Sequence, residues 1–274
     1  MSHTLTQPRF LTIVEPVLRD MPAGVLHDAL HEAYFECAPE LSSIEESFDL
    51  LTAKKHDQEV LRRFFHSWQQ TNNSASSVAG QTCRFTLKAN KSALSIEDVQ
   101  ACYNVVNDLQ RIVDEDFGAH GELMHADLYY RMATAICGDD SWLSKTYQSE
   151  AAKTFRGWML KQRLRDRSLL NGLLFTLIHE TYTHGEMELI RPMFADWLVE
   201  RLGFGKSEAN KTMAWIIVHT GGLEAEHSRH ALNAVRGYCK LAGEEVEQPI
   251  AQPLFTTYLR YKAAVMSDLI PSLQ

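Results

Sequence analysis

Apolar residues recur three and four positions apart through almost every segment of this 274-residue chain. The pattern is clear in AGVLHDALHEAYFECA (residues 23–38) and in SIEESFDLLTAKKHDQEVLRRFFHSWQQT (residues 43–71). It gives each of a series of helices one apolar face. We find no run with strand alternation, no hairpin turn and no internal repeat. The sequence therefore predicts an all-α fold, a single-domain helical bundle spanning residues 1–274 with seven or more helices.

Several helix ends are marked in the sequence. Ser95 stands three residues before Asp98, a capping-box variant that predicts a helix start, and Gly118 predicts where that helix ends. Pro192 predicts a kink or break inside a long helical segment. The segment NNSASSVAGQTC (residues 72–83) is rich in small polar residues and predicts a loop.

Composition and charge exclude several classes of protein. The net charge of -8 argues against a nucleic-acid-binding or anionic-membrane-binding surface. The densest basic run, LKQRLRDR (residues 160–167), reads as the solvated face of a helix, with a ligand-facing patch as the alternative. Five scattered cysteines without a CxxC pair disfavour a zinc ribbon and fit a reducing cytosol. No stretch approaches the roughly 20 apolar residues that span a bilayer, so we expect a cytoplasmic protein.

Three predicted helical segments place carboxylates beside histidines. They are VDEDFGAHGELMHADLYYR (residues 113–131), IHETYTHGEMELIRP (178–192) and VHTGGLEAEHSRHA (218–231). Each alone is a weak signal, because Glu/His pairs four residues apart are common on exposed helix faces. Together they suit a metal centre: mixed carboxylate and imidazole ligands bind iron, manganese or zinc, and a two-metal site favours iron or manganese. Helical bundles build such sites from Glu and His on facing helices.

The glycine pair Gly221-Gly222 interrupts the third segment. In a straight helix Glu224 would lie about 140° around the axis from His219, too far to share a metal. A π-bulge at the glycines would bring His219, Glu224 and His227 within about 60° of one another. The pair costs about 2 kcal/mol of helix propensity relative to alanine, and a distortion that directs ligands would explain that cost. His230 would lie outside this sector of the helix surface.

Across residues 113–231 the chain resembles the haem-oxygenase-like di-iron oxidases and oxygenases. The first motif of that family is an acidic residue near an aromatic–glycine pair, followed about ten residues later by a histidine. Glu115 and His125 match it by their spacing. Asp116 stays open as the alternative to Glu115, because the family's acid usually comes directly before the aromatic residue.

The second and third motifs follow in the same order as in the family. The second is a glutamate four residues before a proline, matched by Glu188 and Pro192. The third is a histidine, an acid and a histidine on one helix, matched by His219, Glu224 and His227.

The resemblance implies O2 activation at two iron ions per chain, with an external electron donor. It implies oxidation of a small amine-bearing or amino-acid-derived substrate, by N-oxygenation or oxidative C–C cleavage, in specialised biosynthesis. It also suggests a homodimer. The implied metal ligands are Glu115, His125, Glu188, His219, Glu224 and His227.

Three other interpretations stay open. A haem oxygenase proper would use one axial histidine, His27 or His31. A metal-free thiaminase-like helical enzyme would use a cysteine or paired acids. A helical interaction protein would have no chemistry at all. Bound iron would separate the di-iron interpretation from the thiaminase-like enzyme and the interaction protein, and a Soret band would reveal haem.

Overall fold

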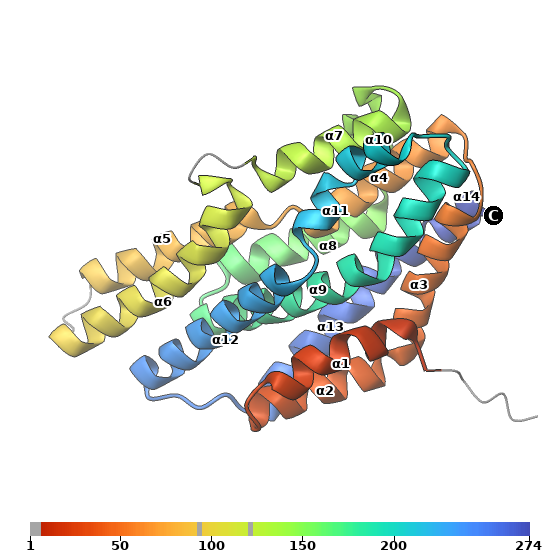
Figure 1. Ribbon diagram of the computed structural model, residues 1–274. Helices are drawn as coiled ribbons and strands as arrows, with labels where there is room; N and C mark the ends of the chain where they lie inside the picture. The colour runs from red at the N-terminus through yellow and green to blue at the C-terminus, as the bar shows by residue number, and fades with distance from the viewer. Residues whose placement is uncertain (1–6, 92–94, 120–122) are drawn as a thin grey trace, which may run out of the picture.

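Helices form all the regular structure in the described part of the chain. The computed structural model (Figure 1) describes residues 7–91, 95–119 and 123–274, without the side chains of Lys91, Leu223 and Glu224. No strand occurs within these residues, which confirms the predicted all-α fold. The α-helices are α1 (Arg9–Asp20), α2 (Val25–Glu36), α3 (Ala38–Ala53), α4 (Gln58–Asn72), α5 (Ala75–Lys91), α6 (Ile96–Asp116), α7 (His125–Cys137), α8 (Glu150–Leu160), α9 (Leu169–Glu200), α10 (Lys206–Thr212), α11 (Ala214–Val218), α12 (Gly222–Ala242), α13 (Gln248–Ser267) and α14 (Ile270–Leu273). Two 3₁₀ turns, η2 (Asp140–Leu143) and η3 (Lys145–Tyr147), precede α8, and a π-helical turn, η4 (Lys161–Arg165), follows it.

The central element is α9, a helix of 32 residues. Every residue from 172 to 183 is buried, so the helix is covered on all sides rather than along one stripe. Helices α1, α12 and α13 pack along α9, and α11 meets it near the candidate site (Figure 1). Polar side chains on this stretch of α9 therefore face the interior of the bundle.

The prediction of a loop for residues 72–83 is wrong. Only Asn73 and Ser74 separate α4 from α5, and α5 packs against α6 as an antiparallel pair (Figure 1). The inner face of α5 carries the buried residues Ser77, Val78 and Gln81, at helical spacing. Tertiary packing of this face overrides the weak helix propensity of a segment rich in serine and glycine.

The structure confirms the predicted ends of α6 but not the predicted helix break at Pro192. The capping box of Ser95 and Asp98 is present at the start of α6, and Gly118, with φ 65°, lies two residues beyond its last residue. By contrast, α9 continues through Pro192 to Glu200, so the proline does not end the helix.

The chain breaks between two helices just before and at the glycine pair, so the predicted π-bulge is wrong. Helix α11 stops at Val218, and α12 begins at Gly222. Gly221 has φ 78° and ψ −140°, a backbone conformation that is essentially open only to glycine. The break separates His219 from the helix that carries His227.

Within the described residues, no helix combines the length and the apolar character that a membrane crossing requires.

Candidate metal centre

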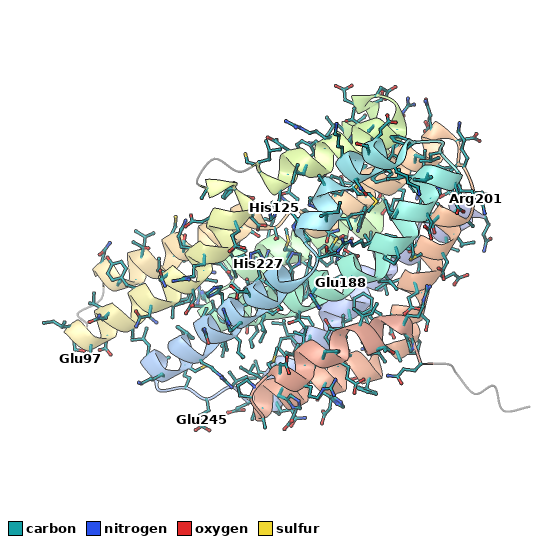
Figure 2. All side chains as sticks on the ribbon, in the orientation of Figure 1. Glu97, His125, Glu188, Arg201, His227 and Glu245 are labelled. Carbon is teal, nitrogen blue, oxygen red and sulfur yellow. The ribbon has the colours of Figure 1, made fainter. Side chains whose placement is uncertain are left out.

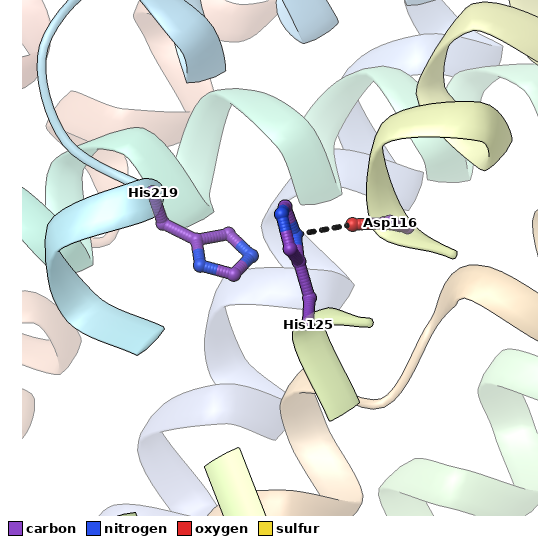
Figure 3. A group of neighbouring side chains, drawn as sticks. All are labelled: Asp116, His125 and His219. Carbon is purple, nitrogen blue, oxygen red and sulfur yellow. Dashed lines mark hydrogen bonds and ion pairs between the residues drawn. The ribbon is translucent and has the colours of Figure 1, made fainter. Parts of the chain in front are cut away.

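Three helix ends bring Asp116, His125 and His219 together (Figure 3). Asp116 is the last residue of α6, His125 is the first of α7, and His219 follows the last residue of α11. One potential ligand atom from each lies within 4.8 Å of the other two. His125 Nδ1 donates a hydrogen bond to Asp116 Oδ1 over 3.0 Å. We call these three residues the first group.

The protonation states of the first group suit a metal. His219 Nδ1 donates to the carbonyl of Trp215 over 2.6 Å, which places the lone pair of the ring on Nε2. Burial and the neighbouring His125 lower the pKa of His219 to about 3, so the ring is neutral at pH 7. Burial alone would raise the pKa of Asp116, but the hydrogen bond from His125 and nearby imidazoles hold it below its usual value. A neutral imidazole and an ionised carboxylate are the forms that bind metals.

A second group of Glu115, Glu180 and His227 lies beside the first. His227 Nε2 donates to Glu115 Oε2 over 2.7 Å, and His227 Nδ1 lies 3.5 Å from Glu180 Oε2. The hydrogen bond from His227 lowers the pKa of the Glu115 carboxyl. Glu180 is only 4% exposed, and its other oxygen, Oε1, has no hydrogen-bond partner among the described residues.

The two groups are contiguous. Glu115 and Asp116 are consecutive, and one small internal cavity is lined by Asp116 and His219 from the first group and by Glu180 from the second. The nearby imidazole of His227 also contributes to lowering the pKa values of Asp116 and His219. Three carboxylates and three imidazoles from α6, α7, α9, α12 and the end of α11 thus share one interior site. Figure 2 marks His125 and His227 on their helices.

A pocket of about 410 Å³, measured out to its mouth, opens onto the first group. Its walls include the aromatic rings of Tyr129, Tyr130 and Trp215. Side-chain amides come from the end of α4 and the short break after it, at Gln69, Asn72 and Asn73.

Four of the six predicted ligands lie in this site: Glu115, His125, His219 and His227. Asp116, the open alternative to Glu115, lies there too, and the two acids contact different histidines. The side chain of Glu224 lies outside the described residues, so its role stays a prediction.

Glu188 lies elsewhere. It is eight residues after Glu180, about 12 Å along the helix axis, and its Oε1 accepts a hydrogen bond from the Gly221 amide over 2.6 Å. The structure places Glu180 beside His227 instead. A signal for Glu180 exists in the sequence, since it is the only acid in the long apolar stretch LLNGLLFTLIHETYT (residues 169–183).

Comparison with known proteins identifies the fold. No protein-family model matches the chain, and no curated protein matches it either. A TenA homologue from Pseudomonas syringae pv. tomato is similar in structure, with a TM-score of 0.66 and 14% sequence identity over 93% of this chain and 95% of that one. At this identity the likeness shows the fold alone.

Two further solved structures are less similar to the chain. One is a domain of unknown function with a haem oxygenase-like fold from Shewanella denitrificans, with a TM-score of 0.49 and 12% identity over 95% of this chain and 88% of that one. The other is a CADD-like protein of unknown function from Nostoc punctiforme, with a TM-score of 0.44 and 15% identity over 92% of this chain and 99% of that one. The chain has the all-α fold that the sequence predicts, and it shares this fold with the TenA homologue.

Proposed function

We propose that this haem oxygenase-like chain is a non-haem di-iron oxidase or oxygenase that activates O2 to oxidise a small amine-bearing substrate. The convergence of three carboxylates and three imidazoles in one interior site carries the proposal. This donor set suits iron. The buried Glu180 Oε1, which lacks a hydrogen-bond partner in the described structure, also fits, because a bound cation would satisfy it.

The two groups divide the ligands between two ions. Asp116, His125 and His219 would hold one iron, and Glu115, Glu180 and His227 the other. When bound, the pair of irons would supply the electrons that reduce O2, and an external donor would restore them. The protein holds the imidazole of His219 neutral and Asp116 ionised. His125 and His219 are buried, which limits the access of water to the first group.

The pocket favours an amine over an anionic substrate. Among the described residues that line it, Asp116 is the one acid, and there is no lysine or arginine. Tyr129, Tyr130 and Trp215 line the pocket, and aromatic rings of this kind can attract a cation. We therefore infer that a substrate amine enters toward the first group, where N-oxygenation or oxidative C–C cleavage would follow.

Anaerobic titration with Fe(II), followed by mixing with O2 in a stopped-flow spectrometer, tests the proposal. We expect saturation near two irons per chain and a transient visible band. Absence of iron binding above background would refute the di-iron assignment.

A matched pair of variants tests the ligand set. His227→Ala should lose the second iron, because His227 contacts both carboxylates of its group. His230→Ala is the control: it lies three residues along α12, and its Nδ1 donates to Asp108 Oδ1 over 3.0 Å. Circular dichroism should show equal helicity in both. Equal iron binding by the two variants would contradict the assignment of His227.

The fold of the TenA homologue supports one alternative, a metal-free thiaminase-like enzyme. Its cysteine form has little support, because none of the cysteines is among the residues that line the pocket. Burial also raises the pKa values of Cys37 and Cys137 to about 12, which keeps both as unreactive thiols. Its paired-acid form would use Glu115 and Asp116 without metal, and the Fe(II) titration separates it from the proposal.

The haem alternative has no support at its expected ligands. His31 is exposed on α2, where its ring stacks on Phe35 with centroids 4.4 Å apart. His27 Nδ1 donates to Oδ1 of its neighbour Asp28 over 2.8 Å. Neither histidine lines the pocket beside the candidate metal centre.

A further inference from the structure

Arg163 lies directly behind the second group, and it is the one residue of the basic run 160–167 that is wholly buried. The sequence favoured a solvated helix face for this run, and at Arg163 that is wrong. The π-helical turn η4 carries Arg163 into the interior, against α9. Single π-turns of this kind are frequent at functional sites.

The surroundings of Arg163 are built to hold a guanidinium. Its Nε donates to Thr176 Oγ1 over 3.2 Å and its Nη1 to Ser77 Oγ over 2.9 Å. The ring centroid of Phe175 lies 4.8 Å from its Cζ. Gly172 lets η4 approach α9, because a Cβ there would lie 3.2 Å from the carbonyl oxygen of Gln162.

The remaining nitrogen of the guanidinium faces the metal centre. Arg163 Nη2 lies 4.0 Å from Glu180 Oε1, too far for a hydrogen bond. Both atoms are buried, and neither has a hydrogen-bond partner among the described residues. Burial lowers the pKa of Arg163 to about 10, so it stays charged at neutral pH. A fixed cation therefore stands behind a carboxylate that faces the candidate metal site.

We propose that Arg163 is a positioning residue that weakens metal binding at the second group, by holding Glu180 in the metal-free protein and by repelling the incoming cation. Two effects act in the same direction. The metal must draw Glu180 away from the attraction of the guanidinium, and the two positive charges then share a dry interior where charge interactions are poorly screened. This proposal rests on the proposed metal centre.

The direction of the effect separates this role from a purely structural one. Loss of a structural arginine would distort the site and weaken metal binding. Loss of a competing cation would strengthen it. At an effective dielectric constant of about 20, a unit charge within about 10 Å of a divalent ion acts with several times the thermal energy, so we expect a gain of at least about tenfold.

The test is a Co²⁺ titration at pH 8, followed by visible absorbance, of the full-length protein. The Co²⁺ site that contains Glu180 is the one whose absorbance is lost in the variant Glu180→Gln. Arg163→Gln removes the charge and keeps amide donors for Ser77 and Thr176; Arg163→Met is a second neutral variant in case the first does not fold. Both should bind Co²⁺ at this site at least about tenfold more tightly than the wild type.

Two control variants isolate the charge. Arg163→Lys keeps the charge and should stay within about threefold of the wild type. Ser77→Ala removes a hydrogen-bond partner of Arg163 without changing any charge, and it should leave the affinity unchanged. Weaker or equal binding by the folded neutral variants would overturn the proposal, as would equal tightening in Ser77→Ala. Failure of both the wild type and the folded neutral variants to bind Co²⁺ would instead overturn the metal centre itself, and this proposal with it.

Discussion

Replacing Gly221 with alanine tests how the chain turns between α11 and α12. Gly221 combines φ 78° with ψ −140°, and a Cβ there would meet no atom within 4 Å. The substitution therefore adds no steric clash with neighbouring groups and isolates the strain of the backbone. Residues forced into this region destabilise a protein by about 1–3 kcal/mol.

The neighbouring Gly222 is a matched control. It is the first residue of α12, its φ is not in the positive range, and a Cβ there would also meet nothing within 4 Å. Alanine at such a compatible position stabilises by about 0.4–1 kcal/mol, because it restricts the unfolded chain. The two substitutions should therefore differ in sign, by about 1.5–4 kcal/mol in total. For a chain of this size 1 kcal/mol corresponds to about 2–4 °C in Tm.

The assay is urea denaturation of the metal-free variants at pH 7, followed by tryptophan fluorescence, with thermal melts beside it. Gly221→Ala should unfold at lower urea and lower temperature than the wild type, and Gly222→Ala at higher values. A continuous helix with a π-bulge would have helical φ at both glycines, so alanine at either position would then stabilise. Stabilisation by both substitutions would refute the helix break and restore the bulge.

Two further predictions concern the core. Burial lowers the pKa of Lys262 from 10.5 to about 8 beside Glu186, so between these pH values the unfolded chain binds the proton and the folded chain does not. Urea denaturation measures the free energy of unfolding of the wild type and of the double variant Lys262→Met/Glu186→Gln. From pH 8 to 10.5 this free energy should rise by up to about 3 kcal/mol in the wild type relative to the double variant. A difference between the two proteins that does not change with pH would contradict the lowered pKa of Lys262. Trp68→Ala removes a wholly buried ring packed edge-on against Trp215 and should cost about 3–5 kcal/mol. Ile96→Ala, at a side chain that is 82% exposed, should stay within about 0.5 kcal/mol in the same melts, and equal losses would refute the assigned burial.

Local chemistry was enough to predict much of the fold. The apolar spacing gave the all-α class, and the pair Ser95 and Asp98 predicted the start of α6, because capping depends on residues within one turn. The same local reasoning failed for residues 72–83. The helix there depends on partners that are distant in sequence, such as Arg163 against Ser77, and these contacts leave no trace in the composition of the segment.

The residue types of the site were also visible in the sequence, because clusters of histidine and acid are conspicuous on helices. The sequence did not show which of these histidines and acids contact one another. Glu115 and Asp116 are both in the site because they are the last two residues of α6, and each contacts a different histidine. Spacing to His125 alone could not show that both contacts form at once.

The sequence by itself determined the helical class, the three segments whose acids and histidines form the candidate site, and the position of the helix break at the glycine pair. Tertiary structure alone decided that Glu180 rather than Glu188 lies beside His227, that a break rather than a bulge separates α11 from α12, and that Arg163 is buried behind the site. The physical reason is that periodicity fixes the face of a helix on which a residue lies. The depth at which that face meets its neighbours depends on how helices far apart in the chain pack around α9.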